Sequence, residues 1–179
     1  VLLDRPLMDP PDGLLDLGVP FTIAIDAQAP DGRAKMWLYR AAGFEIFTSM
    51  DLPETLTAVN VALITDAAVQ AVPMATGLWP SHYDHGPRSP AQLRWLQDHL
   101  AKENLGFLPQ LDVTISGDMR RASDVLNALD FAAETAAQTG QAVVALNPVA
   151  EIWDVLRFWL RHSNHRDSVI APLSAVLTR

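Results

Sequence analysis

The segment from Pro80 to Ser89 concentrates the side chains that could do chemistry. His82 and His85 stand there in an H-x-x-H spacing. Imidazole and carboxylate groups are ligands for zinc and similar divalent ions. Asp4 and Asp112 each follow an apolar run, and strand ends can converge at one edge of a sheet. We hypothesise that these four side chains bind a metal ion. The alternative is that the segment from Pro80 to Ser89 is a solvated polar loop.

Short apolar runs alternate with amphipathic stretches along the whole chain, which is typical of βα units and a mostly parallel sheet or barrel. We predict seven strands, over residues 1–4, 21–26, 44–48, 75–79, 106–111, 142–146 and 168–171. We predict helices over residues 31–42, 58–71, 90–103, 120–139 and 149–162. One βα unit is expected to be shortened near residues 116–121, because the strand ending at Leu111 passes almost directly into the next helix.

Two helices carry clear local signals. Ser89 is a suitable N-cap and is followed by Pro90 at the first helical position. In the last long helix, Ile152, Leu156 and Trp159 share one apolar stripe, so we expect this face to pack inward.

Composition excludes several classes of protein. The 179 residues include no Cys, which removes disulfide frameworks and thiolate chemistry. The formal net charge of -8 disfavours nucleic acid as a partner. No apolar run is long enough for a membrane span, and neither a phosphate-binding Gly-rich loop nor a G-x-S-x-G nucleophile elbow occurs.

Several segments, in order, resemble the divergent polysaccharide deacetylases of the NodB-like superfamily. The segments are VLLDRP, LLDLGVPFTIAIDAQAPD, YRAAGFEIF, ATGLWPSHYDHGPRS, LGFLPQLDVT, GQAVVALNP and SVIAPLSAVL. Each motif is weak by itself, but their shared order covers nearly the whole chain. The chain is therefore expected to be one divergent polysaccharide deacetylase-like domain over residues 1–179.

The resemblance implies a distorted (β/α) barrel of about seven mostly parallel strands, with its active site at the carboxyl ends of the strands. It also implies carbohydrate metabolism in the periplasm or cell envelope, a polysaccharide ligand and, if the protein is active, a divalent metal such as zinc. In such enzymes an Asp and two His hold the metal, a second Asp is the base and a further His is the acid. Asp4, His82 and His85 are the metal candidates, and Asp4 and Asp112 are the catalytic candidates.

Two replacements depart from the family pattern. Arg5 stands where the family has its second Asp, and a guanidinium can neither accept a proton nor bind a metal. Asn147 replaces the His of the family's "GHP" motif and cannot titrate. We therefore predict a catalytically degenerate deacetylase-like domain. The alternatives are a non-enzymatic envelope module that binds glycan or protein, and an acidic subunit of a larger complex.

Further residues are candidates for the site, and most of them have two interpretations. Trp79 and Tyr83 could stack on a sugar ring or close a lid over the core. Asp51 matches a polar family segment and is expected to line the cleft. Asp112 is either a site residue or a hydrogen-bond anchor for Thr114, and Asp26 is either a site residue or, preferably, a cap for the following turn.

Overall fold

A computed structural model describes residues 2–4, 14, 16–71, 74–80, 89–108, 111–116, 119, 121–146, 149–162 and 169–177. Its strands form one seven-stranded sheet in the order β5-β4-β3-β2-β1-β7-β6, with every pairing parallel. The strands are β1 (Leu2–Asp4), β2 (Thr22–Asp26), β3 (Glu45–Met50), β4 (Gly77–Pro80), β5 (Gly106–Phe107), β6 (Val113–Ile115) and β7 (Val144–Leu146).

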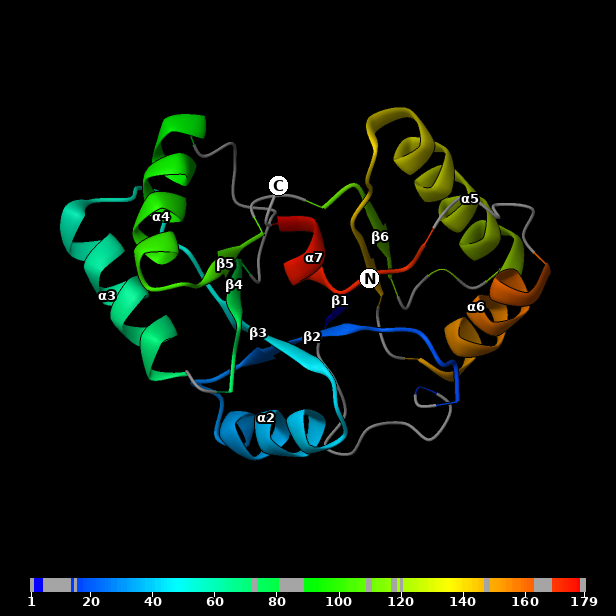
Figure 1. Cartoon of the computed structure of the whole chain (residues 1–179), viewed down its shortest axis with the longest axis horizontal. Helices are drawn as coiled ribbons and strands as arrows, with labels where there is room; N and C mark the ends of the chain where they lie inside the picture. Colours follow the sequence, from blue (N-terminus) through cyan, green and yellow to red (C-terminus); the bar gives the residue numbers. More distant parts are fainter. Residues whose placement is uncertain are drawn as a thin grey trace.

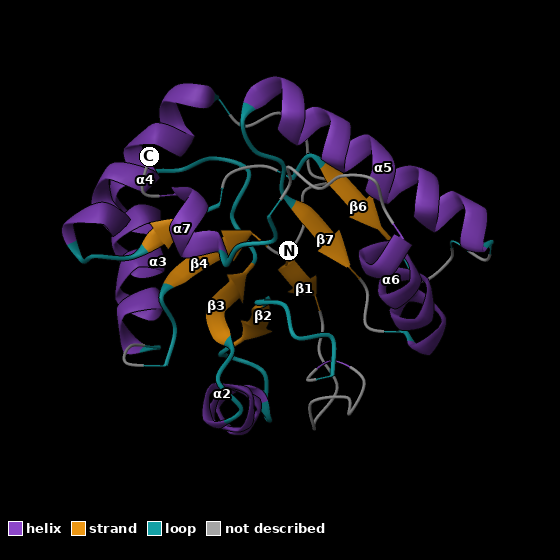
Figure 2. Cartoon of the chain, turned by 45° about the vertical axis from the view of Figure 1, so that its right-hand side comes forward, coloured by secondary structure: helices purple, strands orange, loops and turns teal. Residues whose placement is uncertain are grey.

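Helices surround the sheet on its outer face (Figure 1, Figure 2). They are α2 (Gly32–Ala41), α3 (Ala58–Gln70), α4 (Pro90–Lys102), α5 (Ala122–Thr139) and α6 (Ala150–His162). As predicted, Ser89 caps α4, because its hydroxyl accepts a hydrogen bond from the Ala91 N–H at 3.3 Å. None of the described helices is both long and apolar enough to cross a membrane.

The sheet must curl, because a short connection joins its two edge strands. Residues 108–112 lead from β5 to β6, which lie at opposite ends of the strand order. The six steps from Phe107 to Val113 span at most about 21 Å of extended chain. A flat sheet of this size would separate its edge strands by roughly 29 Å. The two halves of the sheet therefore bend toward each other, as Figure 1 shows.

The predicted (β/α) barrel is wrong, because the sheet is open. In the described part of the chain β5 and β6 each pair with one neighbour and not with each other. The expected strand at 168–171 is also wrong, since residues 169–171 form no strand, and the strand over 113–115 was missed. The shortened unit lies before β6, at 108–112, rather than at 116–121.

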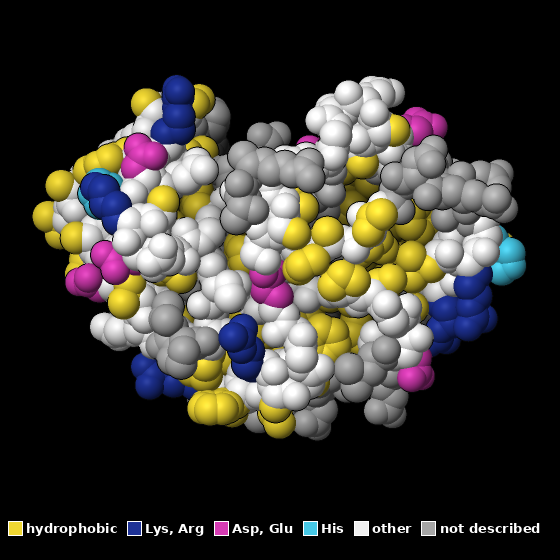
Figure 3. All heavy atoms as spheres, in the orientation of Figure 1, with side chains coloured by type: hydrophobic (Ala, Val, Ile, Leu, Met, Phe, Trp, Pro, Cys, Tyr) yellow, Lys and Arg dark blue, Asp and Glu magenta, His cyan; other side chains and the backbone are white. Residues whose placement is uncertain are grey.

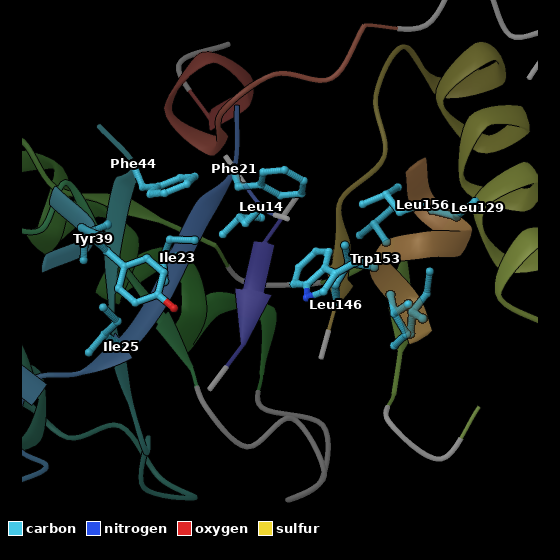
Figure 4. Close-up of a cluster of buried hydrophobic side chains, with 14 of the residues drawn as sticks. Leu14, Phe21, Ile23, Ile25, Tyr39, Phe44, Leu129, Leu146, Trp153 and Leu156 are labelled. Carbon is cyan, nitrogen blue, oxygen red and sulfur yellow. The ribbon is translucent and has the colours of Figure 1, made fainter. Parts of the chain in front are cut away.

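The outer face of the sheet packs against the helices in an apolar core. Phe21 and Trp153 meet there edge to face, with ring centroids 6.2 Å apart and an angle of 82° between the rings. Figure 4 shows Trp153 of α6 and Leu129 of α5 in the same cluster as Ile23 of β2. The inward stripe predicted for α6 is confirmed at Ile152 and Leu156, which are almost fully buried.

A separate cluster fills the inner, concave face of the sheet. It joins Ala24 of β2, Phe47 of β3 and Trp79 of β4 to Val143 and Ala145 from the other half of the sheet. Leu108, which follows β5, and Leu173 of α7 complete the cluster. Because side chains from both halves meet here, these side chains can be buried only if the sheet curls.

The last described helix, α7 (Leu173–Leu177), holds the amino edge of the sheet, where the parallel strands begin. The Leu173 N–H donates to the Thr22 hydroxyl at 2.9 Å. That hydroxyl donates in turn to the Glu45 carboxylate, which also accepts from the Ser174 N–H at 3.3 Å. Leu173 itself is buried in the inner cluster, so this segment closes the apolar interior at the amino edge.

Two glycines make room for the Phe47 ring, which gives a test of the inner packing. A Cβ on Gly77 would lie 2.6 Å from Phe47 Cζ and 2.7 Å from the Gly106 carbonyl oxygen. A Cβ on Gly106 would lie 3.3 Å from the same ring atom. We expect Gly77→Ala to lower the free energy of unfolding by about 2 kcal/mol, the usual size of an overpacking penalty. Gly106→Ala is the matched control.

Urea denaturation followed by circular dichroism measures both variants. We expect Gly106→Ala to lose less free energy of unfolding than Gly77→Ala, since the Phe47 ring needs to move only a few tenths of an ångström to accommodate it. Equal stability of wild type and Gly77→Ala would show that Phe47 does not lie across β4 and β5.

Candidate functional site

The carboxyl edge of the sheet, where the parallel strands end, carries two of the predicted residues, Asp26 and Trp79, together with Ser49, which the sequence analysis did not single out. Asp26, Ser49 and Trp79 occupy one register row across β2, β3 and β4. The row lies two residues beyond Ala24 and Phe47, and alternate residues of a strand share a face. Asp26, Ser49 and Trp79 therefore continue the inner face up to its carboxyl edge.

Asp26 ends β2 and organises the turn that follows it. Its Oδ1 accepts a hydrogen bond from the Gln28 N–H at 2.8 Å, so the preferred capping interpretation is confirmed. Gly32 begins α2 so close to this turn that a Cβ there would lie 2.0 Å from the Asp26 carbonyl oxygen. At the same turn, a hydrogen bond from Lys35 lowers the pKa of Asp31.

Trp79 is buried, with only 4% of its surface exposed. Its ring packs in the inner cluster, which places it with the residues that close the core rather than with an open sugar-stacking surface. Its indole Nε1 has no hydrogen-bond partner in the described part of the chain.

Asp112 lies at the other edge of the sheet. It directly precedes β6, so it stands at the amino end of a strand rather than at the carboxyl end. Its Oδ2 accepts from the Val143 N–H at 2.6 Å, next to the start of β7. The structure makes Asp112 an anchor between β6 and β7, with Val143 in place of the expected Thr114, and does not bring it to the strand end that carries Asp4.

The remaining predicted residues divide into two groups. Asp4 is the last residue of β1 and pairs in register with Ala24, so it reaches the carboxyl edge. Asp51 directly follows β3 at the same edge and is exposed. The predictions for Arg5, His82, Tyr83, His85 and Asn147 fall outside the described residues.

Among the side chains that the structure describes, no group of three His, Asp or Glu residues is arranged to hold a metal ion. The hydrophobic cavity visible in Figure 3 is of another kind. Its volume is about 100 Å³, and α5, α6, β7 and the segment before α7 line it with apolar side chains such as Ala133, Leu156 and Ile170. It offers no group for acid–base chemistry.

Comparisons with known proteins define the fold but not the activity. No family model and no curated protein matches this chain. The chain resembles the crystal structure of an uncharacterized protein from Agrobacterium tumefaciens C58, with a TM-score of 0.69 and 18% sequence identity. The match covers 98% of this chain and 87% of that one. At this identity the likeness establishes a shared fold alone.

The placement of Asp112 leads to a stability prediction. Asp112→Ala leaves the Val143 N–H without its acceptor, which should lower the free energy of unfolding by about 1–3 kcal/mol. Asp112→Asn keeps one acceptor oxygen and should lose less. Chemical denaturation measures both. Because Asp112 stands at the amino edge, neither variant should alter ligand binding at the carboxyl edge. A loss of binding without a loss of stability would show that Asp112 belongs to the binding site.

Proposed function

We propose that this chain is a deacetylase-like domain that binds acetylated polysaccharide of the cell envelope at the carboxyl edge of its sheet and is catalytically degenerate. One observation carries the proposal. Asp4 ends β1, and the segment that contains His82 and His85 begins directly after β4 ends at Pro80, so both start from the same edge. This is the arrangement that the resemblance to the divergent polysaccharide deacetylases requires.

The donor set fits a divalent ion such as zinc, since one carboxylate and two imidazoles are common zinc ligands. When bound, such an ion would polarise an acetamide carbonyl. Arg5 follows Asp4 directly and brings a permanent positive charge that opposes a nearby cation. Because Arg5 cannot accept a proton and Asn147 cannot titrate, this chain lacks the base and the acid of the family mechanism. We therefore propose binding without efficient hydrolysis.

Metal content measured by elemental analysis tests the site. The purified protein is incubated with zinc, desalted and compared with His82→Ala and His85→Ala. We expect one zinc per chain in the wild type and loss of zinc in both variants. His99→Ala is the matched control, because His99 lies on α4 and its Nδ1 interacts with the Trp95 carbonyl oxygen at 2.9 Å.

The same samples decide between binding and catalysis. Release of acetate from an N-acetylglucosamine oligomer is expected to stay at background, whereas binding of the oligomer is expected to be measurable. Zinc-dependent acetate release would show that Arg5 and Asn147 do not abolish catalysis. A protein that takes up no zinc and binds no acetylated oligomer would contradict the proposed function.

A second candidate function, an acidic subunit of a larger complex, is favoured by exposed apolar side chains. Val59 and Leu63 lie one turn apart on α3 and are 68% and 62% exposed. Trp37 on α2 is 66% exposed. If this surface binds a partner, the labelled chain should sediment as a larger species in an extract of its source. The double variant Val59→Glu, Leu63→Glu should then sediment as a free chain of 19.6 kDa.

A further inference from the structure

The apolar cavity of about 100 Å³ lies at the amino edge of the sheet, away from the proposed glycan site. It is enclosed by α5, α6, the start of β7 and the segment that leads into α7. Figure 3 shows hydrophobic side chains gathered on this face between α6 and α7, so the cavity opens toward solvent. Asp4 and Asp26 end their strands at the opposite, carboxyl edge. The cavity is therefore a separate feature of the surface.

The inward face of α5 changes from large to small side chains where the cavity lies. Val125 and Leu129 fill the core along the first half of this face. The next positions on the same face are Ala132, Ala133 and Ala136, and all three line the cavity. Two further alanines, one before β7 and one before α7, also line it. Because an Ala side chain ends at its Cβ, these positions leave space that larger side chains would fill.

The lining of the cavity is entirely apolar. All thirteen lining residues are Ala, Val, Leu, Ile or Trp. Trp159 is the one among them with a polar side-chain atom, and its Nε1 donates to Asp130 Oδ1 at 2.7 Å. A charged or polar group that entered this cavity would lose its water without gaining a side-chain partner. The cavity therefore selects a hydrocarbon group.

The size of the cavity limits this group to a short one. An apolar cavity of about 150 Å³ takes up benzene, so by proportion a volume of about 100 Å³ has room for roughly four carbon atoms. An apolar side chain of a protein partner would also fit by size. Its peptide N–H and C=O groups, however, would lose water against lining side chains that cannot bond them. An alkyl chain that enters end-on brings no such groups.

We propose that this cavity binds the end of an unbranched alkyl chain, carried by a small amphiphile whose polar head stays in water. The alanines of α5 set the length of chain that is buried. This inference is independent of the proposed function, because the cavity and the carboxyl edge lie at opposite ends of the strands.

A series of primary alcohols from propanol to hexanol tests the size of the site. The alcohols are titrated into protein with ¹³C-labelled alanine methyl groups, and the Ala133 and Ala136 signals are expected to move. The dissociation constant should fall by about fourfold per carbon up to butanol, the effect of burying one methylene group, and then change little up to hexanol. An unbroken fall through hexanol would show partition onto apolar surface and overturn the proposal, as would the absence of saturable shifts.

Ala136→Leu fills the cavity, and Ala137→Leu is the matched control. Ala136 is half-buried and lines the cavity, whereas its neighbour Ala137 is exposed and does not. Ala136→Leu should weaken butanol binding by more than about tenfold, because the added carbons occupy most of the space. Its melting temperature should stay the same or rise, since filling a cavity adds apolar contact. Ala137→Leu should bind butanol as the wild type does.

Equal affinity of the two variants for butanol would overturn the proposal. If Ala136→Leu does not fold, the alcohol series on the wild type still decides it. N-acetylleucine amide, which presents an apolar side chain on peptide groups, should bind more weakly than pentanol. Tighter binding of this amide would assign the cavity to a protein partner and overturn the alkyl chain as its occupant. No glycan enters these titrations, so failure of the proposed function leaves their outcome unchanged.

Discussion

The short connection between the two edge strands is the constraint on which the rest of the structure depends. With only residues 108–112 between β5 and β6, the sheet cannot lie flat. Curling turns one face inward, and Phe47, Trp79 and Leu173 fill the space between the two halves. The edge strands β5 and β6 therefore need no hydrogen bonds to each other, because side-chain packing and α7 hold the two halves of the sheet together.

The same packing gives the two edges of the sheet different properties. At the amino edge, Thr22 and Glu45 accept hydrogen bonds from the backbone N–H groups of Leu173 and Ser174. The start of α7 therefore covers the apolar interior there with its polar groups hydrogen-bonded. At the carboxyl edge, Asp26 ends β2 and caps the turn that follows it, and the exposed Asp51 follows β3.

The proposed function, glycan binding without turnover, makes limited demands on the carboxyl edge. A binding site requires shape and hydrogen-bonding groups, whereas hydrolysis also requires a base and an acid. In the proposed function, Arg5 and Asn147 stand at the positions where the resemblance expects titratable groups. Asp26 and Ser49 retain hydrogen-bonding capacity, and neither depends on a metal for it.

The sequence by itself determined most of the local structure. Periodicity and capping placed the helices from α2 to α6 within a few residues, because these signals act over one or two turns. It missed β6, and it mistook the apolar residues before α7 for a strand, because a short apolar run does not reveal its hydrogen-bonding partner. Only the tertiary structure decided that the sheet stays open, that Asp112 stands at the amino edge and that Trp79 is buried. Each of these depends on strand order and curvature, which are set by contacts between residues far apart in the chain.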